Sequence, residues 1–344
     1  MQSLRGSIGS CLAAAIVWSW LGAAAAAQQR IVIVGSGSNV SLPLYRAWTS
    51  KFNANNDSIQ IRYLPLGTAE SFRQISRGIG DFGGGEIILT GEQMHGSKVQ
   101  LITIPIVLVG VVPIYNLPGN PELNFSGGLL AQIYLGTVKN WKDPRIAKLN
   151  PEMEFPDLPI RVVHRSPGKG SNFIFTDFLS KTDSRFRAAV GRSPSPHWPL
   201  GLEAERGEDM ATKVASTRGA IGYVDLGLVR NSGFGYGRVE NAAGRFVKAT
   251  TDSIEAACAA VENSLPADFR LDMTNAPGKD SYPITSFTWF YVTTSGTSST
   301  RRNALKQFLD WCFHDGQKVA ADMGYAPLPD RIVAKARAAV NGLQ

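Results

Sequence analysis

The hydrophobic residues of this chain recur in a pattern of strand, turn and helix that appears three times. The first unit begins with a continuous apolar run at 31–34, which is typical of a buried parallel strand. A Gly/Ser-rich turn at 35–39 follows it. Beyond the turn, apolar residues recur at spacings of three and four, which predicts one face of a helix: Leu42, Tyr45, Trp48 and Phe52.

The second and third units repeat this order with different turns. An alternating strand is expected at 59–64, a turn at 67–70, and then a helix whose apolar face runs through Phe72, Ile75 and Ile79. The third unit has an apolar strand that ends at Arg165, a turn at 166–171 and a helix with Phe173, Phe175 and Phe178 in the core. Three such units predict an α/β fold, in which mainly parallel sheet is flanked by helices. If the chain forms two lobes, as the next observations suggest, we expect such a sheet in each of them.

Two long apolar strands, at 101–114 and 288–293, enclose a middle block that is rich in loops. The chain order therefore suggests a first lobe, a middle lobe and a return to the first. This layout is typical of two-lobed binding proteins joined by two hinge strands. We expect lobe I to comprise 30–108 plus 285–344 and lobe II to comprise 109–284, with hinges near 107–109 and 283–285.

The segment 1–27 has the pattern of a secretory signal. Arg5 gives a positive start, an apolar stretch follows, and the alanines that end at Ala27 offer a cleavage site. A retained membrane helix is the alternative, but the stretch is short and ends in small residues. An exported protein cleaved near Ala27 would keep two cysteines, Cys258 and Cys312, either as a disulfide or as two buried thiols.

Composition narrows the classes further. With 44% hydrophobic and 18% charged residues, the chain is neither disordered nor a collagen-like repeat or coiled coil. The formal charge of +7 is scattered and not gathered in basic runs, so no nucleic-acid partner is expected. Three cysteines in 344 residues cannot form a disulfide framework.

The usual signatures of catalysis are absent from the sequence. The four histidines lack metal-ligand spacing, no G-x-S-x-G elbow occurs, and neither a Walker A loop nor a dinucleotide fingerprint is complete, so no metal or cofactor is expected. What remains are the helix-opening turns, whose free N–H groups and helix dipoles attract anions. Ser38, Asn39, Thr68 and Ser171 add side-chain donors there. An oxyanion held between two lobes would use them.

From about Arg30 to Val340 the chain resembles the periplasmic phosphate-binding proteins of the bacterial phosphate ABC importer. The resemblance is carried mainly by a specific Trp-containing stretch at 133–141. Further matching stretches are 146–151, 219–224, 282–286 and 325–329. The resemblance implies an exported, monomeric, non-enzymatic receptor that binds inorganic phosphate and delivers it to an inner-membrane ABC permease.

The resemblance also implies eight ligand-binding positions. At the first turn, the family's Thr-Phe pair corresponds to Asn39 and Val40, which keep the backbone donors. Thr68 takes the place of a serine in the second turn. The family's Asp-Phe-Gly-x-x-Asp is similar to 81–86, with Glu86 in the ligand-contacting place and Asp81 holding the turn. In the third turn, the positions are Arg165, Lys169, Gly170 and Ser171, with Lys169 expected to project into solvent.

In this interpretation, Arg165 supplies charge and a forked pair of donors. Glu86 supplies an acceptor for the P–OH of phosphate, which sulfate lacks at neutral pH, so it would select against sulfate. Because Glu86, Lys169 and Asn39 depart from the family's pattern, a receptor for another oxyanion remains an alternative. An exported phosphatase-like enzyme on the same scaffold is a second alternative, which rests on analogy.

Overall fold

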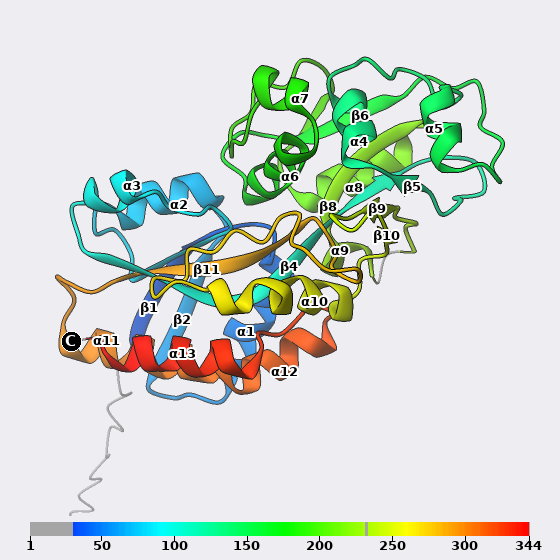
Figure 1. Cartoon of the computed structure of the whole chain (residues 1–344). Coiled ribbons are helices and arrows are strands. Elements are labelled where there is room, and N and C mark those ends of the chain that lie inside the picture. The colour runs from blue at the N-terminus through cyan, green and yellow to red at the C-terminus, as the bar shows by residue number, and fades with distance from the viewer. Residues whose placement is uncertain (1–29, 231–232, 344) are drawn as a thin grey trace, which may run out of the picture.

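The computed structural model describes residues 30–230 and 233–343, so the expected signal segment lies outside the described residues. Two lobes are joined by one eight-stranded sheet (Figure 1). Across the sheet the strands are β2 (Ile59–Leu64), β1 (Ile31–Gly37), β3 (Phe82–Gly85), β11 (Thr285–Thr293), β4 (Leu101–Tyr115), β8 (Ala220–Asp225), β6 (Arg161–Arg165) and β7 (Leu202–Ala204). A second, three-stranded sheet consists of β10 (Phe246–Val247), β9 (Arg238–Glu240) and β5 (Asn124–Phe125).

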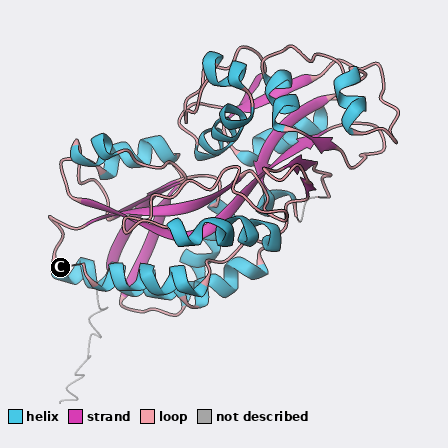
Figure 2. Cartoon of the chain, in the orientation of Figure 1, coloured by secondary structure: helices cyan, strands magenta, loops and turns pink. Residues whose placement is uncertain are grey.

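Helices cover both faces of the large sheet, as expected for an α/β fold (Figure 2). In chain order they are α1 (Leu42–Ala54), α2 (Thr68–Ile75), α3 (Gly91–His95), α4 (Gly127–Tyr134), α5 (Pro144–Leu149), α6 (Gly170–Thr182), α7 (Ser184–Ala189), α8 (Gly207–Ser216), α9 (Leu226–Val229), α10 (Thr251–Val261), α11 (Ser299–Phe313), α12 (Asp315–Asp322) and α13 (Asp330–Asn341), with a 3-10 turn at Glu262–Ser264. The three predicted turns open α1, α2 and α6, which confirms the repeated unit.

Strand β4 connects the two lobes. Its 15 residues extend over about 50 Å. Residues 101–110 pair with β11, and residues 111–115 pair with β8. Both pairings are antiparallel, whereas β1 lies parallel to β2 and β3 and β6 lies parallel to β7 and β8. The predicted lobe boundaries fall inside β4 and at the start of β11, and they remain a prediction.

One predicted element ends earlier than expected. Helix α2 stops at Ile75, so the prediction of a helical, core-facing Ile79 is wrong: that side chain is 55% exposed. The reason is local. Gly78 has φ +79°, and the backbone N–H of Ile79 donates to the carbonyl of Gln74, which is a typical left-handed helix ending.

The Trp-containing stretch has a structural role in the core. Trp141 is fully buried, and its indole N–H donates to the carbonyl of Gly219 at 2.9 Å. A Cβ at Gly219 would lie 2.5 Å from the carbonyl oxygen of Pro159, and φ there is +78°, so glycine is required. Two matching stretches therefore meet inside lobe II.

The two described cysteines are separate buried thiols. Cys258 lies on α10 and Cys312 on α11, and neither forms a disulfide. Burial raises the pKa of Cys258 to about 12, so its thiol stays protonated and unreactive at neutral pH. Of the two possibilities that the sequence left open, the structure has the free thiols. Among the described residues, no helix is long and apolar enough to cross a membrane.

Candidate functional site

The helix-opening turns of the two lobes face each other where the lobes meet. The amide N–H of Ala69, in the first turn of α2, donates to the carbonyl of Gly168 at 3.1 Å. Four predicted site residues belong to lobe I, namely Asn39, Val40, Thr68 and Glu86. The other four are Arg165, Lys169, Gly170 and Ser171, which fall in lobe II; both assignments follow the predicted lobe bounds.

Glu86 lies at the centre of this interface, directly after β3, and is fully buried. Its carboxylate accepts three hydroxyl hydrogen bonds. Ser38 Oγ lies 2.7 Å and Thr68 Oγ1 3.1 Å from Oε2, and Thr288 Oγ1 lies 3.1 Å from Oε1. Burial raises the pKa of Glu86 to about 7, although the hydroxyl bonds favour the ionised form and oppose this rise. The group therefore titrates near neutral pH.

Gly170 brings lobe II against this carboxylate. A Cβ at Gly170 would lie 1.8 Å from Glu86 Oε2 and 2.9 Å from Thr68 Oγ1, so glycine alone permits this approach. Gly170 is the first residue of α6, and the positive end of the helix dipole therefore faces Glu86. Three predicted residues, Thr68, Glu86 and Gly170, thus meet at one point.

In the turn before α1, the backbone N–H groups of Asn39 and Val40 are expected to be free for a ligand, but the N–H of Val40 is already hydrogen-bonded. The N–H of Val40 donates to Ser38 Oγ at 2.9 Å, and this hydroxyl in turn donates to Glu86. Asn39 also lies in this turn, and its Oδ1 is buried without a hydrogen-bond partner among the described residues. Ser38, and not Val40, therefore makes the side-chain contact to the buried carboxylate.

Arg165 ends β6 and is 2% exposed. Its Nη1 donates to Ser171 Oγ at 3.2 Å, and its Nη2 donates to the carbonyl of Glu205 at 2.9 Å. Nε is buried and has no partner within the described part of the chain. Burial lowers the pKa of the guanidinium from its ordinary value, but an arginine remains charged at neutral pH. A buried cationic donor therefore remains available to a ligand.

Lys169 does not project into solvent, so that prediction is wrong. It is 7% exposed, and its ammonium is ion-paired with Glu205, which also accepts from the hydroxyl of Ser166. Burial would raise the pKa of Glu205, but the bonds from Lys169 and Ser166 lower it. The exposed carboxylate of Glu205 at the end of β7 holds the lysine back from solvent.

Sequence reasoning missed two members of this site, Thr288 and Glu205. Thr288 lies in the middle of a buried apolar strand, where no pattern singled it out. Glu205 follows β7, which pairs in parallel with β6, so its position after a strand end was the one available signal. Within the described residues, no group of three or more His, Cys, Asp or Glu side chains is arranged to hold a metal ion.

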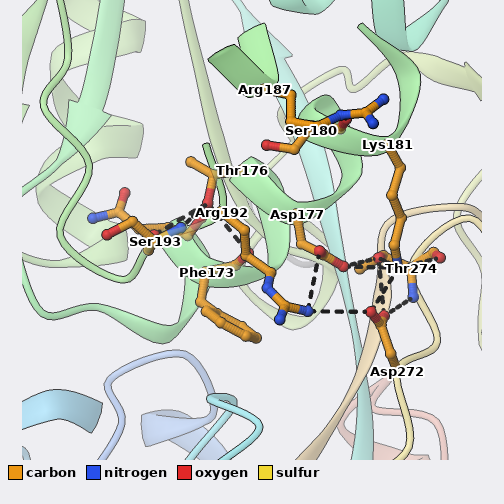
Figure 3. Close-up of polar contacts among 11 residues, drawn as sticks. Phe173, Thr176, Asp177, Ser180, Lys181, Arg187, Arg192, Ser193, Asp272 and Thr274 are labelled. Carbon is orange, nitrogen blue, oxygen red and sulfur yellow. Dashed lines mark hydrogen bonds and ion pairs between the residues drawn. The ribbon is translucent and has the colours of Figure 1, made fainter. Parts of the chain in front are cut away.

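A polar network at the far end of α6 connects this helix to the segment before β11, which falls within the predicted bounds of lobe II but contacts lobe I (Figure 3). Lys181 Nζ lies 2.9 Å from Asp177 Oδ2 and 2.7 Å from Asp272 Oδ2, and Arg192 Nη1 lies 3.4 Å and 3.5 Å from the same two carboxylates. The segment that carries Asp272 is anchored to lobe I, because the Arg270 guanidinium donates to the carbonyl of Leu89 at 2.7 Å. Burial, with the charge of Asp272, raises the pKa of Asp177.

Taken together, the site offers as donors the buried Nε–H of Arg165, the hydroxyl of Ser171 and the N-terminus of α6, beside the carboxylate acceptor of Glu86. Such a set fits an oxyanion that itself carries a proton, because the proton can be donated to the carboxylate while the donors satisfy the remaining oxygens.

Comparison with known proteins agrees with the fold. The family model described as PBP superfamily domain matches residues 23–315. A curated phosphate-binding protein PstS of Xylella fastidiosa is 34% identical over 307 residues, covering 88% of this chain and 83% of the relative. A PstS of Haemophilus influenzae is 33% identical, covering 88% and 90%.

Solved structures resemble the whole arrangement at low identity. A phosphate-binding protein from Stenotrophomonas maltophilia superposes with a TM-score of 0.66 at 17% identity, covering 89% of this chain and 93% of that one. An ABC-type phosphate transport receptor from Vibrio cholerae superposes with a TM-score of 0.59 at 19% identity, covering 86% and 100%. These likenesses concern the fold.

Proposed function

The chain belongs to the PBP superfamily, and on this premise we propose that it is a receptor that binds inorganic phosphate between its two lobes. The relatives at 33–34% identity are named phosphate-binding proteins, and the solved structures that share the fold include a phosphate transport receptor. The predicted fold and family resemblance are confirmed by the same findings. The assignment of individual ligand contacts remains a proposal.

Binding replaces the hydration of the anion with donors from both lobes. Arg165 Nε, which lacks a protein partner among the described residues, donates to one phosphate oxygen. The hydroxyl of Ser171, which accepts from Arg165 and keeps its own proton, and the N-terminus of α6 serve the other oxygens. Thr68 can donate to the anion only by giving up its hydrogen bond to Glu86. Since Glu86 belongs to the predicted lobe I and Arg165 to the predicted lobe II, a ligand that contacts both residues favours the closed arrangement of the lobes.

Glu86 provides the discrimination among oxyanions. Monobasic and dibasic phosphate carry a P–OH that donates to the carboxylate, whereas sulfate at neutral pH presents only lone pairs. A buried bond that is left unmade costs about 1–3 kcal/mol, and more when the group is charged, which corresponds to a preference of about fivefold to more than a hundredfold. The buried Glu86 beside Gly170 is the observation that carries this proposal.

Export and delivery complete the proposal. We infer that residues 1–27 direct the chain to the periplasm, with cleavage near Ala27. There, as a monomer without catalytic activity, the protein would pass phosphate to an inner-membrane ABC permease. The relatives are binding proteins by name, which supports a receptor over an exported phosphatase.

Isothermal titration of the purified mature protein with phosphate tests the function. We expect a saturable exothermic or endothermic signal with one site per chain. Absence of binding at millimolar phosphate would contradict the receptor assignment. A phosphatase assay on the same sample separates the alternative class, since turnover of an aryl phosphate would contradict a receptor without catalysis.

A further inference from the structure

Strand β11 contributes a hydroxyl to the buried carboxylate of the site. Thr288 is fully buried, and its Oγ1 lies 3.1 Å from Glu86 Oε1. The register explains the contact: Trp289 of β11 pairs with Gly85 of β3, so the residue before Trp289 lies beside the residue after Gly85. Two residues separated by 202 positions in the chain are thus held together by sheet pairing.

The hydrogen bonds divide unevenly between the two oxygens of Glu86. Of the hydroxyls, those of Ser38 and Thr68 donate to Oε2 and that of Thr288 donates to Oε1, and the backbone N–H of Glu86 also bonds to the carboxylate. An ionised carboxylate can accept about four hydrogen bonds, two at each oxygen. Thr288 therefore holds Oε1 in place, while Oε2 faces Gly170 of α6.

We propose that Thr288 is a positioning residue for ligand selection, which orients Glu86 so that its carboxylate accepts the proton of a hydrogen-bearing oxyanion. The inference rests on the proposed function, because it names the residue that acts through Glu86 in that site. Thr288 itself need not touch the ligand. Its hydroxyl fixes the carboxylate and stabilises the ionised form.

The described side chains around Glu86 include no charged group that could orient its carboxylate in place of the hydroxyls. The titratable side chains that face it are buried tyrosines whose pKa values burial raises well above the ordinary value, so they stay neutral: Tyr45 of α1, Tyr63 of β2, Tyr291 of β11 and Tyr325 before α13. In lobe II, the ammonium of Lys169 is ion-paired with Glu205, and Arg165 donates to Ser171 through Nη1 while its Nε has no partner among the described residues.

Loss of the Thr288 hydroxyl should therefore weaken selection in a pH-dependent way. With one hydrogen bond fewer to the charged form, the pKa of Glu86 rises above its value of about 7. A larger fraction of Glu86 is then protonated at neutral pH. A protonated carboxyl can donate a hydrogen bond to sulfate, so sulfate is no longer excluded.

The experiment compares Thr288→Val with Thr288→Ser and with Thr293→Val. Valine keeps the shape and removes the hydroxyl, serine restores it, and Thr293→Val makes the same change in β11 where the hydroxyl contacts Thr297 instead. Affinities for phosphate and for sulfate are measured by calorimetry from pH 6 to pH 9. At pH 7 we expect Thr288→Val to lose roughly tenfold of the phosphate-over-sulfate ratio, which is the effect of a rise of about one pKa unit.

The pH profile separates positioning from a general structural effect. The midpoint at which sulfate becomes excluded should move to higher pH in Thr288→Val and return with Thr288→Ser, while Thr293→Val behaves as the wild type. An unchanged ratio and midpoint in Thr288→Val would overturn the inference while leaving phosphate binding intact. A wild-type protein that binds no phosphate would instead overturn the proposed function. Should valine prevent folding, Thr288→Ala removes the same hydroxyl and is judged by the same ratio and midpoint.

Discussion

Replacing Gly170 with alanine should weaken phosphate binding without harming the fold. The added Cβ would lie 1.8 Å from Oε2 and 2.8 Å from Cδ of Glu86, and 2.9 Å from Thr68 Oγ1. Both contacted side chains belong to lobe I, whereas Gly170 belongs to lobe II. The obstruction therefore arises only when the lobes close, and each lobe alone can accommodate the methyl group.

The expected loss of phosphate affinity can be estimated from the hydrogen bonds that Glu86 must break. For the lobes to close, Glu86 must give up at least one of its hydroxyl bonds. A hydrogen bond to a charged group is worth about 1.5–3 kcal/mol, so the affinity should fall roughly tenfold to a hundredfold. The advantage of alanine over glycine applies to helix interiors, and Gly170 is the first residue of α6, so the exchange changes helix propensity little. The melting temperature of the unliganded protein should therefore stay nearly constant while binding weakens.

Calorimetric titration with phosphate and thermal unfolding without it measure the two quantities. Gly128→Ala is the matched control, because Gly128 lies in the first turn of α4 and a Cβ there meets nothing within 4 Å. That variant should bind phosphate like the wild type. Wild-type affinity in Gly170→Ala would refute the reasoning, since it would mean that the ligand-bound lobes do not approach at Gly170.

Three further predictions concern other parts of the site. Because burial raises the pKa of Glu86 to about 7 in the folded protein, the free energy of unfolding should fall by up to ~3 kcal/mol as the pH rises from about 4.5 to 7. Chemical denaturation of Glu86→Gln over the same pH range should lack this fall. A variant whose pH profile equals that of the wild type would contradict the burial argument. Arg165→Lys should weaken phosphate binding at least tenfold by titration because it removes Nε, whereas the exposed Arg161→Lys at the other end of β6 should not. Asp272→Asn should weaken phosphate binding a few-fold, because it removes ion pairs that connect α6 to the segment anchored on Leu89. Small-angle scattering should then give a larger radius of gyration. Unchanged scattering and affinity would argue against that role.

The repeated strand, turn and helix units could be predicted because each follows a local rule. Apolar runs and spacings of three and four residues mark β1, α1 and β6, and these elements formed where expected. The end of α2 was misplaced because an apolar residue at the right spacing does not reveal the left-handed backbone at Gly78, which ends the helix first.

Only some of the residues of the candidate site could be predicted from the sequence. Family resemblance identified Thr68, Glu86 and Gly170, which the structure brings together. Thr288 could not be found, because its contact with Glu86 depends on the register between β11 and β3. The burial of Lys169 depends likewise on Glu205, which is distant in sequence and is brought close by the pairing of β6 with β7.

The central claim is that a buried carboxylate selects a ligand that carries a proton. Phosphate titration of the wild-type protein at pH 9, with and without an excess of sulfate, tests this claim most directly, because Glu86, with a pKa of about 7, is then ionised while dibasic phosphate still carries its P–OH. The account predicts the same phosphate affinity in both titrations, and a loss of this resistance in Glu86→Gln, whose amide can donate to sulfate. A phosphate affinity that falls in proportion to added sulfate in the wild-type protein would contradict the account.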